Sequence, residues 1–163
     1  MNHAKISLIL EYRTRSQGKN ICDVGCGNGY LTEFISDRTQ AHTVGIDVSP
    51  YAIQLATERT KNKRDRLVFR VGNINSLRNA LSDHSNVETI IALEVMYASD
   101  NLPRTIWEFA TLWPENGQML FIANQHIEQR DTQGHRLLPD QTDIALAIKG
   151  LGGGLMKITA TAV

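Results

Sequence analysis

Apolar residues follow two alternating patterns along the chain. Short runs rich in β-branched residues predict strands at residues 20–24, 42–48, 67–71, 87–95 and 118–123. Between them, apolar side chains recur at i, i+3 and i+4, as in Leu31, Phe34 and Ile35, which is the spacing of a helix. This alternation predicts an α/β fold, a doubly wound and mostly parallel sheet with helices on both faces.

Turn and capping residues set the limits of the other predicted elements. Ser49 and Pro50 predict a helix that continues to about Asn62, because serine caps a helix and proline fits its first turn. Residues 75–82 and a segment opening at Pro103 predict two more helices. The remaining elements are an N-terminal helix within residues 1–18, an irregular loop at 126–140, a helix around 144–151 and a strand at 155–163. Without repeats or linkers, we expect one domain over residues 1–163.

Composition and charge exclude several classes of protein. The 163 residues are 42% apolar, and 17 basic residues balance 17 acidic ones. A net charge of zero gives no electrostatic argument for a nucleic-acid or membrane partner. No apolar stretch is long enough to span a bilayer, and residues 1–10 lack the cleavage site of a signal peptide. Two cysteines are too few for a disulfide scaffold or a metal cluster, so we expect a cytoplasmic protein without a metal site.

A glycine loop, Asp23-Val24-Gly25-Cys26-Gly27-Asn28-Gly29, follows the first predicted strand. Its glycines let the backbone approach a ligand closely, but their G-x-G-x-G spacing differs from the G-x-G-x-x-G of dinucleotide sites. Asp23 would repel a pyrophosphate and attract an ammonium or sulfonium group. Asp47 ends the second predicted strand, where a carboxylate can accept ribose hydroxyls. Together the two acids favour a cationic nucleoside.

Residues 23–29 and 45–50 (GIDVSP) closely resemble motif I and the following acidic strand end of class I, Rossmann-like S-adenosylmethionine-dependent methyltransferases. The resemblance continues through 72–74 (GNI) and 93–97 (LEVMY) and covers about residues 19–124. It implies S-adenosylmethionine as the cofactor and methyl transfer as the reaction. A helix-capping or turn role is the alternative for Asp23 and Asp47.

The resemblance also implies a contact for each cofactor-binding residue. The methionine part would be held by Asp23, Glu94 and the backbone of Gly25, Cys26 and Gly27. The nucleoside would be held by Asp47 at the ribose, by Val48 and Ile74 on the two faces of the adenine, and by Asn73 at its amino group. The family often has an acid where Asn73 stands, but an amide oxygen also accepts a hydrogen bond. A simple turn role is the alternative for Asn73.

Glu94, Tyr97 and His126 are the candidate catalytic residues, because each follows the carboxyl end of strand four or five. His126 is the first choice as a general base, since histidine titrates near neutral pH. The alternatives are packing or solvent-exposed roles. Strand four ends without the Asn-Pro-Pro-aromatic sequence of enzymes that methylate bases or glutamine. With zero net charge, we therefore expect a small-molecule acceptor with an oxygen or nitrogen nucleophile.

The family's sheet normally has seven strands, whereas six are predicted here, so we expect the seventh to be missing. Three explanations are open: the chain is a fragment, a neighbouring subunit supplies the strand, or strand six pairs directly with strand five. An unpaired sheet edge favours association, so we expect a homodimer. Two other functions remain alternatives: a non-catalytic, cofactor-binding partner subunit, and a nicotinamide-dependent oxidoreductase, which the glycine spacing and Asp23 disfavour.

Overall fold

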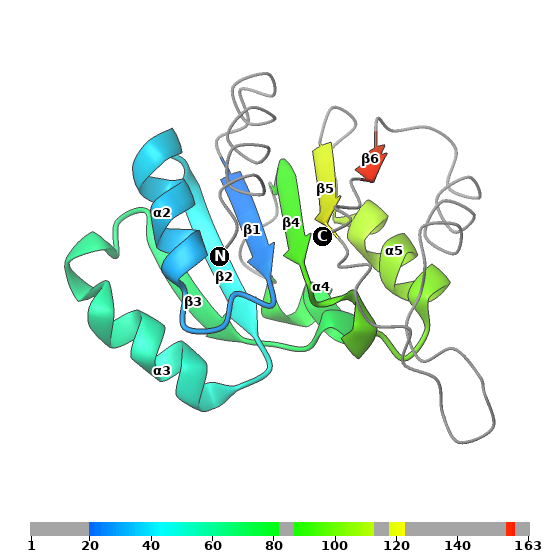
Figure 1. Ribbon diagram of the computed structural model, residues 1–163, viewed down its shortest axis with the longest axis horizontal. Coiled ribbons are helices and arrows are strands. Elements are labelled where there is room, and N and C mark those ends of the chain that lie inside the picture. The colour runs from blue at the N-terminus through cyan, green and yellow to red at the C-terminus, as the bar shows by residue number, and fades with distance from the viewer. Residues whose placement is uncertain (1–19, 82–86, 113–117, 123–155, 159–163) are drawn as a thin grey trace, which may run out of the picture.

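The computed structural model describes residues 20–81, 87–112, 118–122 and 156–158 (Figure 1). The predicted helix within 1–18, the loop at 126–140 and the helix around 144–151 lie outside these residues. No helix in the described part is both long and apolar enough to cross a membrane.

The strands of the described part form one six-stranded sheet in the order β3-β2-β1-β4-β5-β6. Every neighbouring pair is parallel. The strands are β1 (Asn20–Val24), β2 (His42–Asp47), β3 (Leu67–Val71), β4 (Thr89–Leu93), β5 (Gln118–Ile122) and β6 (Met156–Ile158). The predicted parallel α/β sheet is confirmed. The strand order changes direction between β1 and β4, and the carboxyl ends of the strands lie at the lower edge in Figure 1.

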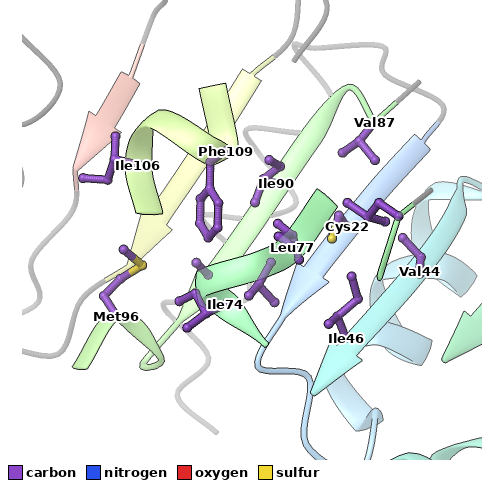
Figure 2. Close-up of a cluster of buried hydrophobic side chains, with 13 residues drawn as sticks. Cys22, Val44, Ile46, Ile74, Leu77, Val87, Ile90, Met96, Ile106 and Phe109 are labelled. Carbon is purple, nitrogen blue, oxygen red and sulfur yellow. The ribbon is translucent and has the colours of Figure 1, made fainter. Parts of the chain in front are cut away.

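Helices cover both faces of this sheet. The α-helices are α2 (Tyr30–Thr39), α3 (Pro50–Arg59), α4 (Leu77–Ala80) and α5 (Leu102–Thr111). Three short 3₁₀ helices, η1 (Lys61–Lys63), η2 (Ile74–Ser76) and η3 (Met96–Ala98), lie in the connections. Ile35 of α2 packs in one buried cluster, whereas Leu77 of α4 and Phe109 of α5 pack in the other, which Figure 2 shows. The α3 helix lies beside α2, to which an Arg59–Glu33 ion pair joins it.

The central strands contribute side chains alternately to the two clusters. Ile21 and Ile91 belong to the α2 side, and their neighbours Cys22 and Ile90 to the side of α4 and α5. A strand between two helical layers is therefore apolar at nearly every position, as the continuous runs in the sequence indicate. Cys22 has no exposed surface and packs in the core as a small apolar residue.

The capping signal before α3 also agrees with the structure. The Ser49 side chain accepts a hydrogen bond from the Ala52 N–H at 3.3 Å, and Pro50 is the first residue of the helix. The predicted end at Asn62 is wrong by one turn. The α-helix ends at Arg59, and the chain continues in the separate 3₁₀ helix η1.

Strand β4 is shorter than the predicted run at 87–95, because the chain turns at Glu94. Glu94 has a φ of 57°, in the left-handed region that non-glycine residues seldom adopt, and this ends the extended backbone after Leu93. Val87 is buried but precedes the strand. The apolar pattern therefore continues beyond the strand because buried loop residues carry it.

Strand β6 pairs directly with β5, with Met119 opposite Met156 and Phe121 opposite Ile158. This is the third of the three arrangements considered from the sequence. The described strand covers Met156–Ile158 of the predicted 155–163. The predicted absence of a seventh strand concerns residues outside the described part.

Candidate functional site

A pocket of about 310 Å³ opens where the strand order changes direction, at the carboxyl ends of β1, β2, β3 and β4. Ligands of doubly wound sheets bind at this position, because the loops diverge there and leave a crevice. The lining residues come from the four strand ends: Val24, Gly25, Ile46, Asp47, Val48, Gly72, Asn73, Ile74, Glu94, Val95, Tyr97 and Ala98. Seven of the predicted site residues meet here, namely Gly25, Asp47, Val48, Asn73, Ile74, Glu94 and Tyr97.

The glycine loop is fixed to the end of β2 by its backbone. The N–H groups of Gly25 and Cys26 both donate to the Ile46 carbonyl, at 2.7 and 3.0 Å. Gly25 has a φ of 76°, and a Cβ there would lie 2.6 Å from Val95 Cγ2. Gly27 also has a positive φ, 54°, but no atom lies within 4 Å of where its Cβ would be. One glycine is therefore required by the fold, whereas the other faces open space and is not among the residues that line the pocket.

Asp47 connects this loop to the start of α3. One carboxylate oxygen accepts the Gly27 N–H at 2.8 Å, and the other accepts the Ser49 N–H at 2.9 Å. A carboxylate has about four acceptor positions, so two hydrogen bonds leave room for two more donors. Asp47 is thus oriented by the backbone and still able to bind a pair of hydroxyls.

Asp23 lies beneath the loop rather than on the pocket wall. Its side chain is 2% exposed and accepts a hydrogen bond from the Thr32 hydroxyl at 2.6 Å. Burial raises the pKa of this carboxyl to about 6, the Thr32 hydrogen bond opposes the rise, and the Asp47 charge adds to it. A carboxylate in this position favours a cation near the loop. Its predicted contact with the methionine part stays a prediction.

Cys26 belongs to the loop but not to the lining of this pocket. Burial raises the pKa of its thiol far above the usual range, with Asp23 and Asp47 adding to the rise. The thiol therefore stays protonated and is a poor nucleophile. The predicted contact of the Cys26 backbone with the methionine part stays a prediction.

The part of the pocket lining that follows β2 and β3 combines apolar and amide groups. Val48 is 68% exposed, whereas Ile74 is buried, and both line the pocket. The Asn73 oxygen accepts the Asn75 N–H at 2.8 Å and caps η2. The turn role considered for Asn73 is therefore present, and Asn73 is also one of the residues that line the pocket.

The part of the pocket lining that follows β4 holds the acceptor-side candidates. Glu94 and Tyr97 both line the pocket, and Tyr97 is 64% exposed. The left-handed backbone of Glu94 is of the kind that collects at functional sites, where the surrounding fold stabilises it. His126 lies outside the described residues, so its role as a general base stays a prediction.

Two residues that no sequence motif marked form hydrogen bonds with the glycine loop. Thr32 holds the Asp23 carboxyl, and Arg59 donates to the Asn28 carbonyl while its guanidinium lies 3.9 Å from the centre of the Tyr30 ring. These partners lie 9 and 31 positions apart in the chain. No motif marks them, because the folded structure alone brings them together.

Comparison with known proteins agrees with this geometry. A family model described as a methyltransferase domain matches residues 15–149. The chain belongs to the class I methyltransferase family. The methyltransferase domain is 26% identical over 121 residues to a ubiquinone biosynthesis O-methyltransferase of Alkalilimnicola ehrlichii, covering 74% of this chain and 48% of the relative. It thus spans about half the length of the curated relatives it matches.

Solved structures share the fold of the methyltransferase domain. The magnesium protoporphyrin IX methyltransferase of Synechocystis PCC 6803, with S-adenosylmethionine bound, superposes with a TM-score of 0.66 at 16% identity, over 91% of this chain and 67% of the other. The cyclase SpnF superposes with a TM-score of 0.72 at 18% identity, over 91% and 56%. The second comparison indicates that the fold also occurs in a protein named for a different reaction.

Proposed function

We propose that this domain binds S-adenosylmethionine at the carboxyl edge of its sheet and transfers the methyl group to the oxygen of a small molecule. The observation that carries the proposal is Asp47, oriented by two backbone N–H groups at the mouth of a glycine loop. A carboxylate held in this way can accept the hydroxyls of a ribose. The charge of Asp23 beside the loop disfavours a pyrophosphate there.

The residues present fit this cofactor. Open space beside Gly27 accommodates a ligand that approaches the backbone closely. Asp47 would accept the ribose hydroxyls, Val48 and Ile74 would contact the adenine faces, and the Asn73 amide would meet its edge. The buried charge of Asp23 would favour the cationic methionine end.

When bound, S-adenosylmethionine supplies a methyl group that is already activated by its sulfonium. The protein therefore has to align the acceptor, exclude water and remove one proton. Glu94 and Tyr97 line the wall opposite the nucleoside residues, so they would position the acceptor. His126 is the proposed base for an acceptor hydroxyl. Transfer to a nitrogen acceptor would use the same wall.

An oxygen acceptor is favoured by the relatives. Three relatives matched at 26% identity are named as O-methyltransferases, two of ubiquinone biosynthesis and one of malonyl-[acyl-carrier protein]. A phenol and a carboxylic acid are therefore the first acceptors to test. A homodimer and a cytoplasmic location complete the proposal.

A second candidate function is cofactor binding without methyl transfer, since the same fold occurs in the cyclase SpnF, which is named for a different reaction. Calorimetric titration with S-adenosylhomocysteine and a transfer assay with labelled S-adenosylmethionine separate the two. Binding with transfer to a phenol or carboxylate is the expected result. Binding without transfer to any acceptor would favour the second function, and absence of binding would overturn both.

A further inference from the structure

The side chain of Asn75 links the two walls of the pocket. Asn73 and Ile74, which line the nucleoside side, directly precede Asn75. Tyr97 and Ala98, which line the acceptor side, lie just before Asp100. Asn75 bonds to this second segment through its amide, although 25 positions separate it from Asp100.

All hydrogen-bonding positions of the Asn75 amide are used. Its nitrogen donates to the Asp100 carboxylate at 2.9 Å and to the Ala98 carbonyl at 3.4 Å. Its oxygen accepts the Asp100 N–H at 3.1 Å and the Thr105 hydroxyl at 3.1 Å. An amide offers two donors and two acceptor positions, so this arrangement is complete. A rotated amide would point its N–H₂ at the Asp100 N–H, so only one orientation fits.

The network continues into the start of α5. Thr105 is 1% exposed, and its single proton goes to Asn75, so the Ser99 hydroxyl must donate to Thr105 across 2.9 Å. Next to the network, Ile74 and Met96 share one buried cluster, as Figure 2 shows. The two segments are therefore joined by apolar packing on one side and by the amide on the other.

We infer that Asn75 is a positioning residue that sets the separation between the nucleoside wall and the acceptor wall of the pocket. This inference rests on the proposed function, because it assigns the two walls to two parts of one site. Asn75 itself is not among the pocket-lining residues, so it acts through Asn73, Ile74, Tyr97 and Ala98.

The test is an exchange of the two partners. Asn75→Asp removes both donors and places two carboxylates in contact, so we expect the dissociation constant for S-adenosylhomocysteine to rise about tenfold or more. Asn75→Asp combined with Asp100→Asn places a donor on the other side of the same contact. We expect this double variant to have a dissociation constant within about threefold of the wild-type value. Asn79→Ala, an exposed asparagine of α4, is the matched control and leaves binding unchanged.

Affinity is measured by calorimetry well below each variant's melting temperature, so that a loss of stability alone does not alter it. Asp100→Ala is a second single variant on an exposed residue and is expected to weaken binding severalfold. In turnover, KM for both substrates should change more than kcat. Unchanged binding in Asn75→Asp and Asp100→Ala, or no rescue by the exchange, would overturn the inference while wild-type binding upholds the proposed function. Absence of binding by wild type would overturn both.

Discussion

The loop after β1 is held mainly through its own backbone N–H groups, whereas the segment after β4 is joined to the rest of the pocket by side chains. Gly25 and Cys26 donate to one carbonyl of β2, and Gly27 to Asp47. Across the pocket, the segment ending at Asp100 is tied to η2 through Asn75. A tight backbone turn requires glycines, and these are visible as a motif in the sequence. A side-chain contact between distant positions has no such motif. The glycine loop could therefore be predicted from the sequence, whereas the link through Asn75 could not.

The largest expected effect separates the two central glycines of the loop. Gly25→Ala adds left-handed strain and a clash with Val95, so the free energy of unfolding should fall by about 2–5 kcal/mol. Gly27→Ala meets open space and adds only the strain, about 1–2 kcal/mol. Chemical denaturation measures both values. Equal losses in the two variants would contradict the distinction between a glycine required by the fold and one that borders the ligand.

Gly27→Ala should in turn impair binding more than its stability loss suggests. Its Cβ would occupy the space that the proposed cofactor enters, so we expect at least a tenfold weaker affinity for S-adenosylhomocysteine. Calorimetry at a temperature where the variant is fully folded tests this. If Gly27→Ala binds with wild-type affinity, the cofactor does not occupy the space beside Gly27.

Asp23 should make the affinity for the cofactor depend on pH. Its pKa is raised to about 6, and a bound ammonium or sulfonium would lower it again. Binding should therefore be constant above pH 6 and weaken as the pH falls below 6, by up to about tenfold per pH unit. Calorimetric titrations between pH 5 and 8 measure this. Asp23→Asn should abolish the dependence, and persistence of the same slope in that variant would assign it to another group.

Thr32→Val tests the cause of this pH dependence by the same calorimetric titrations. The Thr32 hydrogen bond lowers the pKa of Asp23, so its removal should move the onset of weakening to higher pH. A shift to lower pH would contradict the assigned cause.

A smaller effect is expected from Arg59, which supports the loop through the Asn28 carbonyl and the Tyr30 ring. Arg59→Lys keeps the charge but loses the planar, forked guanidinium. We expect about fivefold weaker S-adenosylhomocysteine binding, the scale of one hydrogen bond. Arg38→Lys is the matched control, because Arg38 also lies over an aromatic ring, that of Phe34, without reaching the loop. Equal losses of affinity in Arg59→Lys and Arg38→Lys would contradict a specific role of Arg59 at the loop.

The smallest effect is expected at Lys63, which pairs with Glu33 and Asp37 between α2 and η1. Exposed ion pairs contribute little and are screened by salt. Lys63→Met should lower the melting temperature slightly in low salt and less in 0.5 M salt, with unchanged cofactor affinity. Weaker binding in this variant would extend the functional site beyond the loop.

Much of the fold was predictable because its signals are local. The bounds of β1 and β3 agree with the apolar runs residue for residue, and the Ser49 cap begins α3 as expected. The end of β4 was placed too late, because Glu94 takes a left-handed conformation that its residue type does not announce. An apolar run records burial, and burial continues after the strand has ended.

The site was predictable to a similar depth. Asp47 and Gly25 stand next to the strand ends that position them, so their place in the pocket follows from sequence order. Thr32, Arg59 and Asn75 contact partners 9, 31 and 25 positions away, and no spacing rule connects such residues in advance.

The central claim is that Asp47 binds the ribose of S-adenosylmethionine. Calorimetric titration of wild type and Asp47→Ala with S-adenosylhomocysteine tests it most directly. The expected loss is about 1.5–3 kcal/mol of binding free energy, the range for hydrogen bonds to a charged group, with the fold retained. Binding of equal strength by the two proteins would contradict the placement of the cofactor.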